Sequence, residues 1–290
     1  MSTARLIRRS FRDEVELSIL GFGGIVVTDS EQRHANRVVA EAIEKGINYF
    51  DVAPSYGNAQ ERLGPALKSY RKNCFLACKT TERSAEGARR DLAESFRLLQ
   101  TDTFDLYQLH SISDVEKDVH DVFAKGGAME PILQAKREGR IRYLGFSAHT
   151  EEAALAAMDC YDFDSVLFPL NFCCVRKGGF GPRILEAAQS RGMARLALKA
   201  MARQRWTEAS SSAARKTWRK SWYEPLADPE EAEWALRWTL SQSITAAIPP
   251  GEEELFWLAL DIALRFEPLG TSETERVEEM AMDLDPVFSN

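Results

Sequence analysis

Short apolar runs recur along the chain at intervals of mostly about thirty residues, the length of one strand–helix unit. Several are apolar at nearly every position, as in residues 141–146, which is typical of strands buried on both faces. The eight runs span residues 17–23, 47–53, 74–80, 105–110, 141–147, 165–171, 194–200 and 244–249. We therefore expect eight parallel strands.

Amphipathic helical patterns lie between these runs. In residues 31–45, apolar side chains recur on one face and Gly46 follows as a stop signal. The same periodicity recurs at residues 85–100, 129–138, 151–160, 183–191 and 230–242. Alternation of strands and helices requires a parallel sheet with right-handed crossovers. Eight such units favour an α/β fold of the (β/α)8 TIM-barrel type, with an open doubly wound sheet as the alternative that the pattern leaves open.

The apolar content of the chain is sufficient for one large hydrophobic core. The 290 residues are 44% hydrophobic, and no segment rich in Gly, Ser or Pro divides them. Because barrels of about 250 residues form single domains, we expect one domain over residues 1–290, with an N-terminal extension and a C-terminal helical tail. Residues 201–229 are the longest irregular stretch, and they suit either a lid or a surface loop whose Trp side chains dock on the barrel.

Charge and cysteine content narrow the function classes. The net charge is −7, so we expect no binding to nucleic acid. No run of about 18 apolar residues occurs, so we expect no membrane span, and residues 1–12 lack the apolar core of a secretory signal. The five cysteines have neither disulfide-framework nor zinc spacings, which favours a reducing cytoplasm. The oligomeric state is not determined by these features.

Polar residues of different chemistry end three consecutive predicted strands. Asp51 ends the second strand and a turn leads on to Tyr56, while Lys79 and His110 end the third and fourth. Catalytic residues of such barrels lie at the C-terminal strand ends, so we expect these four to meet. Lys79 near the Tyr56 hydroxyl favours the phenolate and lowers the pKa of Tyr56, and Asp51 keeps Lys79 charged.

This set of side chains suits proton transfer at a carbonyl. A tyrosine of lowered pKa gives or takes a proton near neutrality, and His110 can stabilise the charge that develops on a substrate oxygen. None of these side chains supplies a hydride, so carbonyl chemistry here requires a nicotinamide cofactor.

Three segments resemble the aldo-keto reductase family. They are residues 46–57 with their continuation through 61–64, residues 105–110, and residues 139–147. The resemblance implies a barrel with Asp51, Tyr56, Lys79 and His110 as the catalytic tetrad. It implies hydride transfer between NAD(H) or NADP(H) and a small-molecule carbonyl or alcohol such as an aldehyde, ketone or sugar. Tyr56 would be the proton donor and His110 would orient the substrate.

The resemblance also implies cofactor contacts, some of which depart from the family pattern. The implied contacts are Gly24, Ser147, Lys199, Gly251, Glu252 and Asp261. Ala148 and Leu167 stand where relatives carry amides that hold the nicotinamide. No aromatic residue follows the seventh strand at once, where relatives carry one that stacks on the nicotinamide, and Lys199 there suits a phosphate or substrate contact as well as a solvated rim.

The segment after the eighth strand favours NAD(H) over NADP(H). Relatives that use NADP carry basic residues there, whereas this chain has Gly251 followed by Glu252–Glu254. Carboxylates repel a 2′-phosphate and can accept a hydrogen bond from a ribose hydroxyl. The same acidic residues also suit a helix N-terminus, and the two interpretations are compatible.

Other functions fit parts of the pattern. Asp51, His110 and His149 could be ligands of a metal-dependent hydrolase or lyase, although Tyr56 then has no role. A cofactor-sensing, non-catalytic regulator would keep the barrel, and an acid–base lyase or isomerase would use the same tyrosine.

Overall fold

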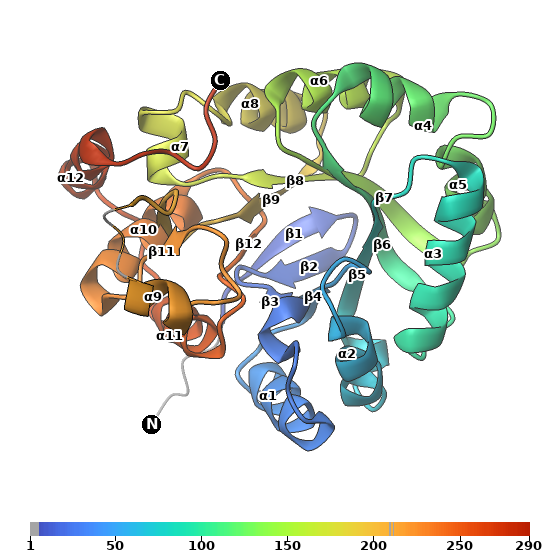
Figure 1. Ribbon diagram of the computed structural model, residues 1–290, viewed down its shortest axis with the longest axis horizontal. Coiled ribbons are helices and arrows are strands. Elements are labelled where there is room, and N and C mark those ends of the chain that lie inside the picture. Colours follow the sequence, from blue (N-terminus) through green and yellow to red (C-terminus); the bar gives the residue numbers. More distant parts are fainter. Residues whose placement is uncertain (1–5, 209, 211) are drawn as a thin grey trace.

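The centre of the computed structural model, which describes residues 6–208, 210 and 212–290, is a parallel sheet of eight strands (Figure 1). In sheet order they are β12 (Ala246–Ile248), β9 (Ala194–Leu198), β8 (Ser165–Pro169), β7 (Ile141–Ala148), β6 (Phe104–Ile112), β5 (Phe75–Thr80), β4 (Tyr49–Asp51) and β3 (Phe22–Gly23). A parallel bridge pairs Leu20 with Ala247. The Gly21 N–H donates to the Ala247 carbonyl at 2.9 Å, so the two edges meet and the sheet closes into the expected barrel.

Helices surround the barrel in Figure 1. The longer ones are α1 (Gln32–Glu44), α2 (Ala59–Leu67), α3 (Ala85–Leu98), α5 (Met129–Arg137), α6 (Glu151–Cys160), α8 (Pro182–Ser190), α10 (Pro229–Ser241), α11 (Glu253–Leu264) and α12 (Thr271–Met280). The shorter ones are η1 (Gly24–Val27), η2 (Arg71–Asn73), η3 (Val115–His120), α4 (Asp121–Phe123), α7 (Phe172–Arg176), α9 (Ser212–Thr217) and η4 (Ala281–Asp283). The six helices predicted from periodicity are all present, because each buries its apolar face on the sheet.

Helix α2 was not predicted from the sequence. It contains Gly64 and Pro65, two residues that disfavour a helix interior. Packing explains the glycine, because a Cβ at Gly64 would lie 2.2 Å from the Leu98 carbonyl oxygen at the end of α3. Tertiary contact therefore outweighs local propensity in this segment.

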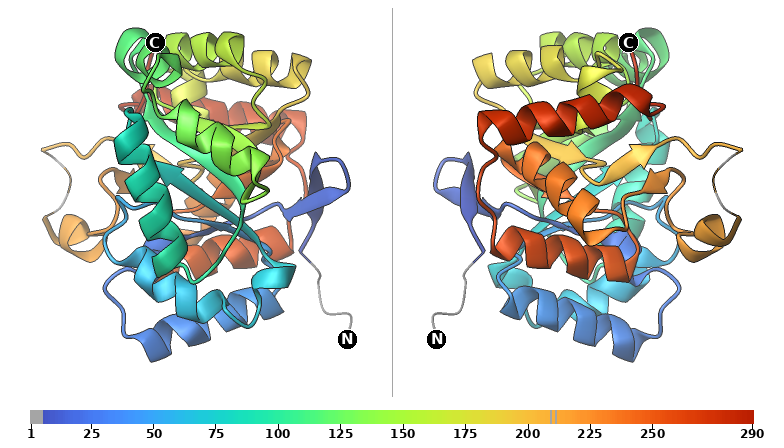
Figure 2. Two further views of the ribbon diagram at one scale, coloured as in Figure 1. Left: turned by 90° about the vertical axis from the view of Figure 1, so that its right-hand side faces the viewer. Right: turned by 90° about the vertical axis from the view of Figure 1, so that its left-hand side faces the viewer.

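The N-terminal extension is a β-hairpin that covers one end of the barrel. It consists of β1 (Arg8–Arg12) and β2 (Val15–Ser18), so the predicted first strand at residues 17–23 was wrong at its start. Phe11 and Leu17 are buried in the cluster that fills the barrel, with the Phe11 ring centroid 4.9 Å from that of Phe75. In Figure 2 this hairpin and α9 lie at opposite ends of the molecule. The hairpin therefore leaves the C-terminal strand ends open.

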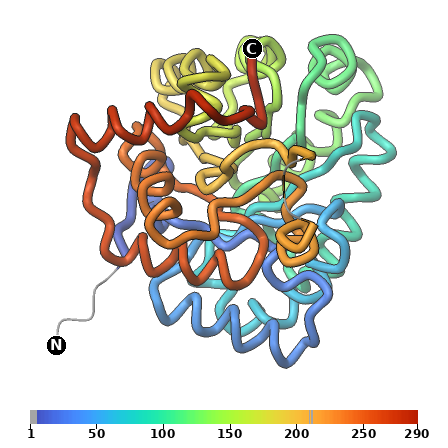
Figure 3. Tube along the Cα trace, turned by 60° about the vertical axis from the view of Figure 1, so that its left-hand side comes forward, coloured from blue at the N-terminus to red at the C-terminus, as the bar shows by residue number. Residues whose placement is uncertain are grey.

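Two later segments reach the open end. In residues 201–229, β10 (Ala202–Gln204) pairs with β11 (Glu224–Pro225), and α9 lies between them. After α12 the chain turns back toward α7 and α8 (Figure 3), where the Asn290 N–H donates to the Gly178 carbonyl at 2.9 Å.

The described residues contain no helix that is both long and apolar enough to cross a membrane. The sequence interpretation of residues 1–12 as lacking a signal falls partly on residues 1–5, which lie outside the description.

Candidate active site

Asp51 and Lys79 form a buried ion pair at the C-terminal ends of β4 and β5. Asp51 is 1% exposed and Lys79 0%, and the Lys79 ammonium donates directly to Asp51 Oδ1. The Tyr49 hydroxyl donates to Asp51 Oδ2 at 3.2 Å. Burial alone would lower the pKa of Lys79, but the charges of Asp51 and Tyr56 and the hydrogen bond to Asp51 together outweigh it and raise the pKa. The lysine is therefore held as an ammonium.

Tyr56 lies in the turn between β4 and α2, directly beside this pair. Lys79 Nζ is 3.4 Å from the Tyr56 hydroxyl and 5.1 Å from the ring centroid. The expected fall in the pKa of Tyr56 was wrong. Burial raises it and the Asp51 charge adds to the rise, and together they exceed the lowering by Lys79. Tyr56 is therefore a protonated phenol in this site.

His110, within β6, faces the same tyrosine. The two ring centroids are 5.7 Å apart with the planes at 83°, and His110 Nδ1 lies 3.4 Å from Ser55 Oγ. Burial, followed by the charge of Lys79, lowers the pKa of His110 to about 2. The imidazole is therefore neutral at physiological pH and suited to hydrogen bonding with a substrate oxygen.

Residues that sequence reasoning did not connect with His110 fix its position. The Arg83 guanidinium donates to the His110 carbonyl at 2.8 Å and pairs with Asp118 at 2.9 Å. Ser111 has a left-handed backbone with φ of 56°, and its N–H donates to Ser147 Oγ at 2.7 Å. Ser147, predicted as a nicotinamide contact, thus also supports the strand end that carries His110. Spacing in the sequence gives no signal for these contacts.

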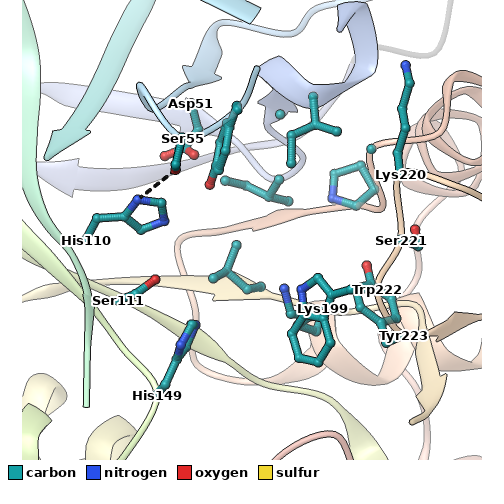
Figure 4. Close-up of a pocket in the computed structure, with 17 residues that line it drawn as sticks. Asp51, Ser55, His110, Ser111, His149, Lys199, Lys220, Ser221, Trp222 and Tyr223 are labelled. Atoms are coloured by element: carbon teal, nitrogen blue, oxygen red, sulfur yellow. Dashed lines mark hydrogen bonds between the residues drawn. The ribbon is translucent and has the colours of Figure 1, made fainter. Parts of the chain in front are cut away.

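Tyr56 and His110 line a cavity of about 310 Å³. Figure 4 shows the residues around it, with His110 at one side. The cavity lining includes Asp51, Lys199 and Gly251 among the predicted site residues, together with His149. Asp51, Tyr56 and His110 thus meet at one cavity, as predicted, while Lys79 lies behind them against Asp51 and Tyr56.

Three predicted cofactor contacts lie away from this cavity or are engaged elsewhere. Gly24 is buried, and a Cβ there would lie 2.9 Å from Val52 Cγ2. The Glu252 carboxylate accepts from the backbone N–H of Lys220 at 2.5 Å. Asp261 lies two turns into α11, where it is exposed and pairs with Arg265 at 3.4 Å.

The loop at residues 201–229 brings aromatic residues to the end of the seventh strand of the barrel. Trp222 and Tyr223 line the cavity, and their ring centroids lie 4.9 Å and 5.1 Å from Lys199 Nζ. The Lys220 ammonium ties this segment to η1 by donating to the Val26 carbonyl at 2.9 Å. Trp206 Nε1 donates to the Ser221 carbonyl at 3.0 Å, a hydrogen bond that joins two parts of the same loop.

The metal alternative has little support in this geometry. In a metal site, the Asp51 carboxylate would have to be a ligand, but here it forms an ion pair with Lys79. Within the part of the chain that the structure describes, no three His, Cys, Asp or Glu side chains gather as a metal-binding group.

We expect His149 to make stability depend on pH. Burial, followed by the charge of Lys199, lowers the pKa of His149 to about 4, against about 6.5 in an unfolded chain. Between these values the unfolded state binds the additional proton, so stability falls as the pH is lowered. His149→Gln should flatten this dependence by up to about 1.4 kcal/mol per pH unit.

Urea unfolding of the wild type and His149→Gln at several pH values between 4.5 and 6.5 measures the effect. His120→Gln, which removes a histidine whose side chain is 54% exposed, is the matched control. Parallel profiles for the wild type and His149→Gln would rule out this contribution of His149.

Comparison with known proteins agrees with this geometry. The aldo/keto reductase family model matches residues 19–279. An uncharacterised oxidoreductase of Bacillus subtilis (strain 168) is 30% identical over 155 residues, 49% of this chain and 48% of that protein. The L-galactose dehydrogenase of Arabidopsis thaliana is 28% identical over 177 residues, 55% of this chain and 53% of that protein. The matches thus span about half the length of these curated relatives.

The fold agrees over nearly the whole length with a solved structure. The holo form of the aldo-keto reductase AKR11C1 from Bacillus halodurans superposes with a TM-score of 0.75 at 22% identity, covering 98% of this chain and 99% of that one. At this identity the likeness concerns the fold alone, and it confirms the predicted barrel. The family model covers most of the sequence, and the chain therefore belongs to the aldo/keto reductase family.

Proposed function

We propose that the chain is an NAD(P)(H)-dependent oxidoreductase that transfers a hydride between a nicotinamide and a carbonyl or alcohol carbon. The observation that carries the proposal is the Tyr56 hydroxyl 3.4 Å from Nζ of the buried Lys79, at a cavity that Tyr56 shares with His110. The raised pKa of Tyr56 and the lowered pKa of His110 agree with the roles proposed for them. Aldehydes, ketones and sugars are the substrate classes to test, since the Arabidopsis relative is named for its action on L-galactose.

In the reduction direction, Tyr56 donates its phenolic proton to the carbonyl oxygen. Its raised pKa keeps the proton in place until the oxygen gains negative charge, and the adjacent ammonium stabilises the phenolate that remains. The low pKa of His110 excludes it as the proton donor near neutrality. His110 instead holds the substrate oxygen by a hydrogen bond, and Asp51 keeps Lys79 charged.

The cavity also suits a nicotinamide. Its wall continues to Ile25, Ile248 and Gly251, which present apolar side chains and backbone to a flat ring. We assign Gly251, which lines the cavity, and Ser147 to holding the cofactor. Gly24, Glu252 and Asp261, which lie away from the cavity or are engaged elsewhere, are contacts implied by the family resemblance alone. When bound, the nicotinamide supplies or accepts the hydride.

We further propose a preference for NAD(H). Glu252, Glu253 and Glu254 lie at the start of α11. Negative charge at this place opposes a 2′-phosphate.

Titration of the protein with NADH and with NADPH, monitored by the quenching of tryptophan emission, tests both proposals. We expect NADH to bind about tenfold or more tightly than NADPH, equivalent to roughly 1.4 kcal/mol. Equal or tighter binding of NADPH would reverse the cofactor preference. Binding of neither nucleotide would reject hydride transfer altogether.

A further inference from the structure

The ammonium group of Lys199 is held inside the cavity by its surroundings. Lys199 directly follows β9 and adopts a left-handed backbone with φ of 65°, which L-residues seldom take. Its carbonyl accepts from Asn171 Nδ2 at 3.0 Å and from the Ala202 N–H at 2.9 Å. The side chain then runs beside the rings of Trp222 and Tyr223. Both its backbone and its side chain are therefore positioned.

This ammonium has no acidic counterpart. Among residues 6–208, 210 and 212–290, no carboxylate forms an ion pair with Lys199, and the carboxylate of Asp51, which also lines the cavity, is bound to Lys79. Lys220, the other cation of the cavity lining, donates to the Val26 carbonyl and extends away from the cavity in Figure 4. Lys199 therefore carries the uncompensated positive charge of the cavity.

The charge of Lys199 acts on the two histidines that line the same cavity, His110 and His149. Its charge lowers the pKa of both His110 and His149, after the larger effect of burial. Burial, together with the charge of Lys79, lowers the pKa of Lys199 itself to about 8. It remains mostly an ammonium at neutral pH, in surroundings where an anion would relieve the unfavourable burial of its charge.

We propose that Lys199 binds the carboxylate or phosphate group of an anionic substrate whose carbonyl lies at Tyr56 and His110. The aromatic rings of Trp222 and Tyr223 position the ammonium without neutralising it, because a cation–π contact leaves the formal charge in place. This inference rests on the proposed hydride transfer and adds a substrate class to it, namely oxo acids and phosphorylated carbonyl compounds in preference to neutral ones.

Matched substrates test the preference. The ratio of kcat/KM for 4-oxobutanoate to that for 4-oxobutanamide should be about tenfold or more in the wild type, the worth of one charge-assisted hydrogen bond. Lys199→Gln should bring the ratio near one, and Lys199→Arg, which keeps the charge, should retain much of it. Lys220→Gln removes the other cation of the lining and should keep the wild-type ratio.

Equilibrium binding separates this proposal from the proposed function. Isothermal titration with malonate, succinate and inorganic phosphate should detect binding of at least one of these anions, weakened roughly tenfold or more by Lys199→Gln, while succinamide does not bind. If the anions bind as expected but neither NADH nor NADPH binds, the anion site at Lys199 is supported and the proposed hydride transfer is rejected.

Two results would overturn the assignment of Lys199. One is that no anion binds and the two substrates react equally well. The other is that Lys199→Gln weakens NADH or NADPH binding while leaving the substrate ratio unchanged, which would assign the ammonium to the cofactor's phosphates instead.

Discussion

Replacing Tyr56 with Phe should lower kcat for carbonyl reduction by roughly 10²–10⁴-fold, the usual contribution of a general acid. The substitution removes one oxygen atom, which lies 3.4 Å from Lys79 Nζ, and keeps the ring beside His110. Because His110 is neutral with a pKa of about 2, it cannot take over as the acid near neutrality. Steady-state reduction of an aldehyde panel at neutral pH measures the loss.

The control for this experiment is Tyr49→Phe. It also removes a buried phenolic hydroxyl from the site, but one that donates to Asp51 Oδ2 and lies on β4. Its effect on kcat should be much smaller than that of Tyr56→Phe. Nicotinamide binding should be spared in both variants. Turnover that is unchanged in Tyr56→Phe would remove the tyrosine from the proposed mechanism.

Replacing Asp51 with Asn should destabilise the fold by roughly 3–5 kcal/mol, the usual cost of leaving one charge of a buried pair without its partner. Lys79 is 0% exposed, so water cannot solvate the ammonium in place of the carboxylate. The Tyr49 hydroxyl still has an amide oxygen to donate to, so the loss reports mainly on the ion pair. Urea unfolding at neutral pH measures the difference in the free energy of unfolding.

The double variant Asp51→Asn, Lys79→Met distinguishes pairing from packing. It removes both charges and keeps a side chain of similar length at position 79, so much of the stability lost by Asp51→Asn should return. If the single and double variants were equally unstable, the cost would lie in packing around Asp51 and the ion pair would contribute little.

Much of the site was predictable because its determinants are local. The turn from Asp51 to Tyr56 and the residues Lys79 and His110 all lie at or just after runs that are recognisable as strands. In a parallel barrel, C-terminal strand ends share one rim, so strand order alone brings such residues together. The sequence therefore determined the barrel and the four polar residues of its proposed tetrad.

Long-range contacts and burial decided the rest. The loop that carries Trp222 and Tyr223 returns to Lys199, more than twenty residues earlier, through anchors at Val26 and Glu252 that no periodicity reveals. Asp261 faces outward because of its turn on α11. The pKa of Tyr56 rises because its desolvation outweighs the attraction of Lys79, and desolvation depends on every element packed around the site. Sequence pattern thus specified which groups meet, while tertiary structure decided how strongly each one is buried and charged.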